Sequence, residues 1–210
     1  MKVFVVYAHP SCNSFTYQAK ERFLAGLADA GHTYEISDLY AMNFKETFTE
    51  QEYMREAFYQ EDLPVPEDVL VEQRKCVEAD AIAFIYPVFW TEAPAKLVGW
   101  FQRVFTYGFA YGEEPALLPF QKAIFLVTMG GSLKDPIRQK EVEAMETVML
   151  LDRINTRAKE KRMIVFDEMT RGNDVENYRE ENQDRFLIQS YELGRNISSI
   201  KEKNYNESQE

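Results

Sequence analysis

The sequence predicts an α/β protein with a doubly wound, five-stranded parallel sheet and helices on both faces of that sheet. Two observations predict it. Short apolar runs alternate along the 210 residues with stretches of helical periodicity. The strongest runs are nearly continuous rather than alternating, as expected for strands that are covered on both faces. For five strands in such a sheet, we expect the strand order 2-1-3-4-5.

The first third of the chain begins with a strand, a helix and a second strand. The apolar run Val3–Tyr7 predicts the first strand. Phe15–Ala30 has apolar residues on one broad side, and Gly31 follows where a helix C-cap is expected. The weaker run His32–Ser37 predicts the second strand.

The middle of the chain predicts two helices and a third strand. Thr49–Gln60 opens with a capping-box pattern, in which Thr49 is followed by Glu52. Pro66–Ala79 begins with proline and two acidic residues, which favour a helix N-terminus. The continuous apolar run Ala81–Tyr86 predicts a strand that is buried on both faces.

The remainder of the chain continues the alternation of helices and strands. A helix is expected at Pro94–Phe105, and a strand follows at Ala123–Val127. Asp135–Ala158 and Tyr178–Ile200 have the pattern of long helices, and Met163–Phe166 predicts the fifth strand between them. We expect a single domain over residues 1–200 and a polar tail over residues 201–210.

Composition excludes several classes of function. The 35 acidic residues outnumber the 24 basic ones and give a formal net charge of −11, which disfavours nucleic acids and anionic membrane surfaces as partners. No apolar stretch approaches the roughly 18 residues of a membrane span, so no membrane insertion is expected. The two cysteines, Cys12 and Cys76, form no disulfide framework, and we expect a cytoplasmic protein with reduced thiols.

A ligand site is expected where the order of the strands reverses. In open α/β sheets, ligands bind beyond the carboxyl ends of the strands at this point, here between the first and third strands. Three loops reach it: His9–Ser14, Pro87–Pro94 and Thr128–Ser132.

The first of these loops is a candidate phosphate site. Free N–H groups and the helix dipole attract an anion at the N-terminus of the helix that follows. The side chains of His9, Asn13, Ser14 and Thr16 add hydrogen-bond donors. The alternative is that Asn13 or Ser14 only caps the helix.

The other two loops suit a planar ligand. Phe89 and Trp90 offer flat apolar surface and backbone N–H groups to a heteroaromatic ring, unless both side chains belong to the core. The adjacent glycines within Thr128–Ser132 allow a ligand to approach the backbone closely, or they form a simple turn.

Other catalytic chemistries have no support in the sequence. No cluster of His, Cys and acidic residues has metal-ligand spacing, so no metal site is predicted. His32 lies in a predicted helix-to-strand turn and is read as structural. The chain contains neither a P-loop nor a nucleophile elbow. We therefore assign no catalytic side chain and expect a cofactor to carry out the chemistry.

Four segments together resemble a known family. They are AHPSCNSFT at 8–16, SDLYAMNF at 37–44, YPVFWTEAPAKLVGWFQRVFTYGFAYG at 86–112 and TMGGS at 128–132. In this order they resemble the flavodoxin-like NAD(P)H:quinone oxidoreductases. The resemblance implies a flavodoxin-like fold and a flavin cofactor. It also implies a homodimer with the flavin near the subunit interface.

The resemblance also implies roles for individual residues. Five residues match the segment that holds the flavin phosphate: His9, Asn13, Ser14, Phe15 and Thr16. Seven match the loops that contact the isoalloxazine ring: Pro87, Val88, Phe89, Trp90, Thr128, Gly130 and Gly131. The compact chain favours FMN, with FAD as the alternative.

The resemblance weakens after Ser132. The better-known quinone reductases of the family have a Tyr and then a His beyond the glycines, near the carbonyl edge of the flavin. Neither residue occurs in Leu133–Lys140. Lys134, Arg138 and Tyr111 are candidates to approach the ring, and the sequence does not choose among them.

The leading functional hypothesis is a flavin-dependent NAD(P)H oxidoreductase. By resemblance, it would transfer a hydride from NAD(P)H to the flavin and then to a quinone or related electrophile, in a ping-pong cycle. The alternative is an electron-carrier or regulatory flavoprotein without significant NAD(P)H turnover, whose acidic surface would suit a basic partner. A third reading is a flavodoxin-like domain that has lost its site.

Overall fold

The computed structural model describes residues 1–169 and 178–200. Its five strands are parallel and form one sheet in the order β2-β1-β3-β4-β5, which confirms the predicted fold class and strand order. The strands are β1 Lys2–Tyr7, β2 Thr33–Asp38, β3 Ala81–Pro87, β4 Phe120–Thr128 and β5 Ala158–Phe166. The predicted polar tail at 201–210 lies outside the described residues.

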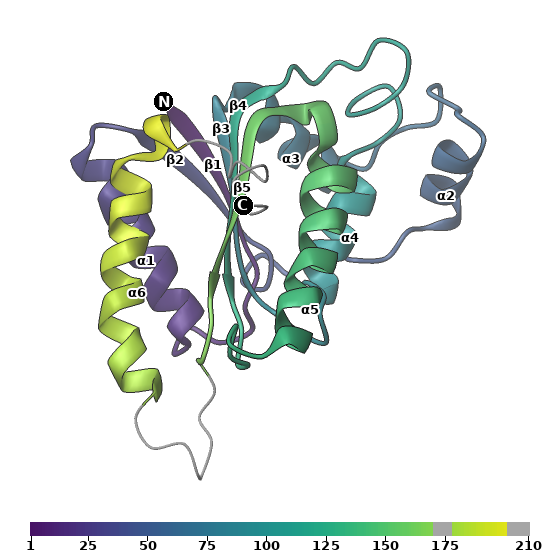
Figure 1. The fold of residues 1–210 in the computed structure, drawn as a ribbon. Coiled ribbons are helices and arrows are strands. Elements are labelled where there is room, and N and C mark those ends of the chain that lie inside the picture. The colour runs from purple at the N-terminus through teal and green to yellow at the C-terminus, as the bar shows by residue number, and fades with distance from the viewer. Residues whose placement is uncertain (170–177, 201–210) are drawn as a thin grey trace, which may run out of the picture.

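Helices cover both faces of the sheet (Figure 1). One face carries α1 Phe15–Asp29 and α6 Tyr178–Arg195, and a short 3-10 turn follows at Ile197–Ser199. The other face carries α3 Glu67–Glu78, α4 Ala95–Val104 and α5 Pro136–Glu146. The short helix α2, Glu50–Ala57, lies outside this layer on the side of α4.

Two hydrophobic clusters form the core, one on each face of the sheet. Along β1, Val3 and Val5 face the layer of α1 and α6, and Phe4 faces the opposite layer, where it contacts the ring of Trp100. Every residue of β3 is buried. This confirms that the continuous apolar runs are strands covered on both faces.

The predicted helical stretch Asp135–Ala158 is helical from Pro136 to Arg157, but the type of helix changes along it. Helix α5 ends at Glu146 and passes into a π-helical segment, Thr147–Ile154, and β5 then begins at Ala158, before the predicted fifth strand. The first half of β5 is rich in charged residues because it lies at the edge of the sheet. The Lys122 ammonium, for example, pairs with the carboxylate of Glu160 in β5. Because these charged residues interrupt the apolar run, the sequence pattern did not predict the first half of the strand.

The strand registers bring the three candidate loops together. Tyr7 lies opposite Ile85, and Pro87 lies opposite Thr128. The loops after β1, β3 and β4 therefore leave the sheet at a similar height, at its lower edge in Figure 1.

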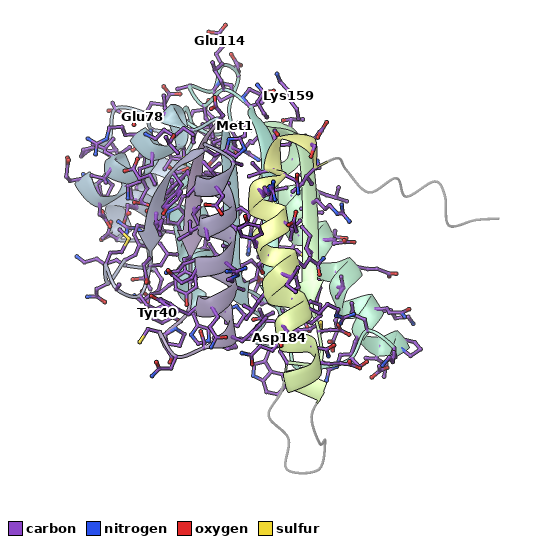
Figure 2. The ribbon with its side chains drawn as sticks, turned by 90° about the vertical axis from the view of Figure 1, so that its left-hand side faces the viewer. Met1, Tyr40, Glu78, Glu114, Lys159 and Asp184 are labelled. Atoms are coloured by element: carbon purple, nitrogen blue, oxygen red, sulfur yellow. The ribbon has the colours of Figure 1, made fainter. Side chains whose placement is uncertain are left out.

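Close packing between α1 and α6 fixes the helix that follows the first loop. The two helices lie side by side in Figure 2, where Tyr40, just after β2, and Asp184, in α6, lie at the same lower end of the molecule. A Cβ on Gly26 would lie 2.0 Å from the backbone oxygen of Tyr191, and one on Gly194 would lie 2.1 Å from that of Phe23. Glycine at both positions therefore lets the helix backbones touch.

Candidate functional site

A cavity of about 380 Å³ opens at the carboxyl ends of β1, β3 and β4. Its lining comprises His9, Ser11, Asn13, Ser14, Phe15, Thr16, Pro87, Val88, Thr128, Met129, Gly130 and Met169. The cavity thus unites the three candidate loops, and among the predicted site residues only Phe89, Trp90 and Gly131 lie outside its lining. Ser11 and Met129 lie within the predicted loops, whereas no sequence signal pointed to Met169.

The first loop ends in a helix N-terminus with free donors. Ser14 is the N-cap of α1, and its hydroxyl accepts a hydrogen bond from the Tyr17 amide at 3.0 Å. The capping alternative therefore describes Ser14 correctly. The next two amides, those of Phe15 and Thr16, have no acceptor within residues 1–169 and 178–200. These two N–H groups and the helix dipole form an anion site beside the cap.

His9 is oriented as a neutral donor. Its Nδ1 accepts a hydrogen bond from the Ser11 amide at 2.9 Å, so Nε2 carries the proton of the neutral ring. Burial lowers the pKa of His9 below its ordinary value, which favours the neutral form. The imidazole can therefore donate one hydrogen bond from Nε2 without a formal charge.

A buried hydroxyl pair joins the first and third loops. The Oγ1 atoms of Thr16 and Thr128 lie 2.8 Å apart, and both residues are almost fully buried. Thr16 was predicted as a ligand donor, but its hydroxyl is engaged in linking the start of α1 to the end of β4. Its free backbone amide is the donor that faces an anion.

The loop after β3 turns tightly at Trp90 and Thr91. The Phe89 amide donates to the Glu92 oxygen at 2.8 Å, and the return bond measures 3.1 Å. Trp90 and Thr91 have φ values of 53° and 61°, a left-handed backbone that non-glycine residues rarely adopt. Such strain is more common at functional sites than elsewhere.

The two aromatic side chains of this turn lie at the surface. Trp90 is 100% exposed and Phe89 is 44% exposed, so the alternative that both belong to the core is wrong. Neither lines the cavity. The Phe89 amide, which was predicted to be available, is bonded to Glu92, whereas the Trp90 amide has no acceptor in the described part of the chain.

The glycine loop after β4 also presents free donors. The amides of Gly130 and Gly131 have no acceptor among the described residues. A Cβ on Gly131 would lie 2.7 Å from Nε of Arg138, so glycine here makes room for that side chain. The loop is therefore more than a simple turn, because it exposes two consecutive N–H groups at the rim of the cavity.

The donor set fits a flavin. One end of the cavity offers amides at a helix N-terminus for a phosphate, and the other offers the glycine amides for the polar edge of a ring. Pro87, Val88 and Met129 supply apolar wall between the two ends. Few convergent donors in an otherwise apolar cavity are typical of a cofactor site.

The cavity lining contains none of the three residues that were candidates to approach the ring in place of the family's Tyr and His, namely Tyr111, Lys134 and Arg138. The Tyr111 hydroxyl donates to Glu56 at 2.8 Å. Lys134 pairs with Glu168 at 3.3 Å, and Arg138 pairs with Glu141 at 2.6 Å. All three candidate side chains are thus engaged with carboxylates.

The described residues offer neither a metal-binding cluster nor a membrane-spanning helix. Residues 1–169 and 178–200 contain no group of three or more His, Cys, Asp or Glu side chains arranged to hold a metal ion. In the same ranges, no helix has the length and apolarity needed to cross a membrane. Cys12 is exposed and Cys76 is buried, and both are free thiols.

Comparison with known proteins identifies the family. A family model described as a flavodoxin-like fold matches residues 1–186. The chain belongs to this flavodoxin-like family. NAD(P)H dehydrogenase [quinone] 1 of Cavia porcellus is 36% identical over 149 residues, which cover 62% of this chain and 54% of that protein. The match therefore spans less than two thirds of this relative's length.

Solved structures of the flavodoxin-like family extend the similarity to nearly the whole chain. The NAD(P)H:quinone oxidoreductase from Methanothermobacter marburgensis is 38% identical with a TM-score of 0.85, covering 95% of this chain and 98% of its own. This confirms the resemblance found in the sequence motifs. An FMN-dependent NADH-azoreductase from Bacillus anthracis, solved with FMN, has a TM-score of 0.66 at 14% identity and covers 95% of this chain and all of its own, so it shares the fold alone.

Proposed function

We propose that this protein is a flavin-dependent NAD(P)H oxidoreductase that reduces quinones or related electrophilic acceptors. The observation that carries the proposal is the pairing, in one cavity, of the anion site at the start of α1 with the free amides of the glycine loop. The similarity to an NAD(P)H:quinone oxidoreductase over 95% of the chain supports it.

The first loop would hold the flavin phosphate. The Phe15 and Thr16 amides donate to it directly, and the neutral His9 ring adds a third donor. Ser14 keeps the helix start in place as its cap. We propose FMN as the cofactor, with FAD as the alternative. Mass spectrometry of the flavin released by heat distinguishes the two.

The glycine loop and the loop after β3 would hold the ring. The amides of Gly130, Gly131 and Trp90 are the donors available to its polar edge. Amides that are already fixed favour charge that develops there without reorganisation. A bound flavin accepts and donates the hydride, so the chain needs no nucleophile of its own.

We also propose that the protein is a cytoplasmic homodimer, with residues 1–200 as one flavin-binding domain. Helix α2 and the turn after it expose large apolar side chains, with Tyr53 at 55%, Phe58 at 56% and Tyr59 at 63%. An exposed patch of this kind is typical of a protein interface. Light scattering after gel filtration tests the dimer, and Phe58→Glu is expected to dissociate it.

Stopped-flow reduction of the bound flavin tests the activity. We expect NADPH or NADH to bleach the yellow protein rapidly, and a quinone to restore the colour in a second, separate mixing step. A protein that binds no flavin would overturn the proposal. A protein that binds flavin but is not reduced by either nucleotide would instead support the electron-carrier alternative, which the net charge of −11 suits.

A further inference from the structure

We propose that Asp167 and Glu168, at the end of β5, are positioning residues that hold the glycine loop and lower the reduction potential of the bound flavin. We call this pair the acidic clamp. The inference rests on the proposed function, because it concerns the same flavin site. The clamp contacts the loop after β4, the region in which this chain lacks the family's Tyr and His.

The clamp binds three consecutive residues of the loop after β4. The Glu168 amide donates to the Gly131 oxygen at 3.0 Å. The Ser132 hydroxyl donates to the Glu168 carboxylate at 2.7 Å, and the Leu133 amide donates to Asp167 Oδ2 at 2.8 Å. Each of these bonds joins residues about 35 positions apart, so the loop is held by tertiary contacts rather than by its own turn.

The backbone beside the clamp continues this pairing into the cavity wall. The Met129 amide donates to the Phe166 oxygen at 2.9 Å, and the Met169 amide donates to the Met129 oxygen at 3.1 Å. Both methionines line the cavity. Backbone hydrogen bonds therefore connect the segment that carries the clamp to two residues of the cavity wall.

Glu168 is itself held firmly in an unusual conformation. Its φ of 56° is left-handed, which costs about 1–2 kcal/mol for a residue with a side chain. Its carboxylate also accepts hydrogen bonds from Asn182 at 3.1 Å and from Lys134 at 3.3 Å. These contacts offset the strain and keep the carboxylate beside the glycine loop.

Among the described charged side chains at the glycine loop, acids outnumber bases. The described charged side chains that contact the loop or one another there are four acids, Asp135, Asp167, Glu168 and Glu141, and two bases, Lys134 and Arg138. The hydrogen bond from Ser132, with those from Asn182 and Lys134, lowers the pKa of Glu168, so its carboxylate is ionised at neutral pH.

A negative environment opposes reduction of a flavin. Reduction places additional negative charge on the ring, and fixed carboxylates close to the loop raise the energy of that charge. The potential of the bound flavin is therefore expected to be lower than it would be with a neutral clamp.

The electrostatic part is tested with Glu168→Gln in the flavin-loaded protein. Glutamine keeps the size of the side chain and one acceptor oxygen for Ser132, and it removes the charge; its amide nitrogen replaces the oxygen that accepts from Asn182. Equilibration with reference dyes should show a higher two-electron potential, by about 30 mV, which corresponds to a tenfold gain in affinity for reduced over oxidised flavin. Glu143→Gln, which removes an exposed charge of the same sign from α5, is the matched control and should leave the potential unchanged. Equal potentials in wild type and Glu168→Gln would overturn the electrostatic role.

The positioning part is tested without flavin. In the apoprotein, Asp167→Ala should speed hydrogen exchange at the Leu133 amide about tenfold or more, because that amide loses its only acceptor among the described residues. Asp167→Asn, which keeps an acceptor oxygen, should restore most of the protection and serves as the variant if alanine unfolds the protein. Unchanged exchange in Asp167→Ala would overturn the clamp. If the wild type fails to bind flavin, the proposed function and the electrostatic role are both overturned. Hydrogen exchange in the apoprotein would still show whether Asp167 holds the glycine loop.

Discussion

The two ends of the cavity are built in different ways. The loop after β1 is held mostly by local hydrogen bonds, which join His9 to Ser11, Asn13 to Ser11 and Ser14 to Tyr17; the Thr16–Thr128 hydroxyl pair adds a long-range contact. The glycine loop after β4 is organised from a distance, by the acidic clamp at the end of β5.

The two ends of the cavity are therefore sensitive to substitutions in different parts of the chain. The first loop presents amides that any helix N-terminus leaves free, so its binding capacity follows from local structure. The glycine loop depends on the pairing of β4 with β5, so substitutions on another strand can disturb it. Changes in the first loop should therefore act on phosphate affinity, and changes in the clamp should act on the properties of the ring.

The largest expected effect is at the first loop. Ser14→Asp keeps a good helix cap but places a carboxylate beside the flavin phosphate, so flavin affinity should fall by about 100-fold or more, or about 2.7 kcal/mol. Fluorescence titration with FMN measures it, and circular dichroism checks the fold. Ser198→Asp, an exposed position far along the chain, adds the same charge and should bind normally. Normal affinity in Ser14→Asp would refute the phosphate assignment.

The next largest effect is expected at the hydroxyl pair of Thr16 and Thr128, which joins the two ends of the cavity. Thr128→Val leaves the buried Thr16 hydroxyl without a partner and should lower the free energy of unfolding by about 1–3 kcal/mol. The double variant Thr16→Val/Thr128→Val removes both hydroxyls and should recover much of the loss. Urea denaturation gives both values. Simple additivity of the two single variants would show that the pair is not coupled.

A smaller effect is expected at the strained turn. Thr91→Gly should raise the free energy of unfolding by about 0.5–1 kcal/mol, because glycine adopts positive φ without the cost paid by a β-branched residue. Thr91→Ala keeps a Cβ and should gain little. Thermal denaturation of both variants measures the difference. Equal stability of the glycine and alanine variants would exclude backbone strain as the cause.

The smallest effect is a pH dependence in the first loop. Burial lowers the pKa of His9, so the unfolded chain takes up a proton more readily than the folded one. The apoprotein should therefore lose stability as pH falls below about 6.5, the ordinary histidine value. His9→Asn should flatten this decline between about pH 5 and 7. His32, whose pKa burial also lowers, needs the matching His32→Asn control. If His9→Asn shows the same pH profile as the wild type, His9 is not the source of the loss of stability.

Most of the fold was predictable from local patterns. Continuous apolar runs identified the central strands, and the capping box at Thr49 and Glu52 is present as expected. The prediction found only the second half of β5, Met163–Phe166, because the charged residues in the first half of this edge strand break the apolar pattern. Phe89 and Trp90 were predicted to contact the ligand, but neither lines the cavity. A tight turn places both rings at the surface.

The pattern of residues along the chain was enough to predict the sheet, the strand order and the three loops that meet at its edge. Periodicity, helix caps and turn residues express energies that act over a few neighbouring positions, so they can be read along the chain. That Met169 lines the cavity, and that Asp167 and Glu168 hold the glycine loop, became visible only in the folded molecule. Those contacts exist because β4 and β5 pair in parallel and end at the same height, and a pairing between distant strands leaves no local mark on the residues that it brings together.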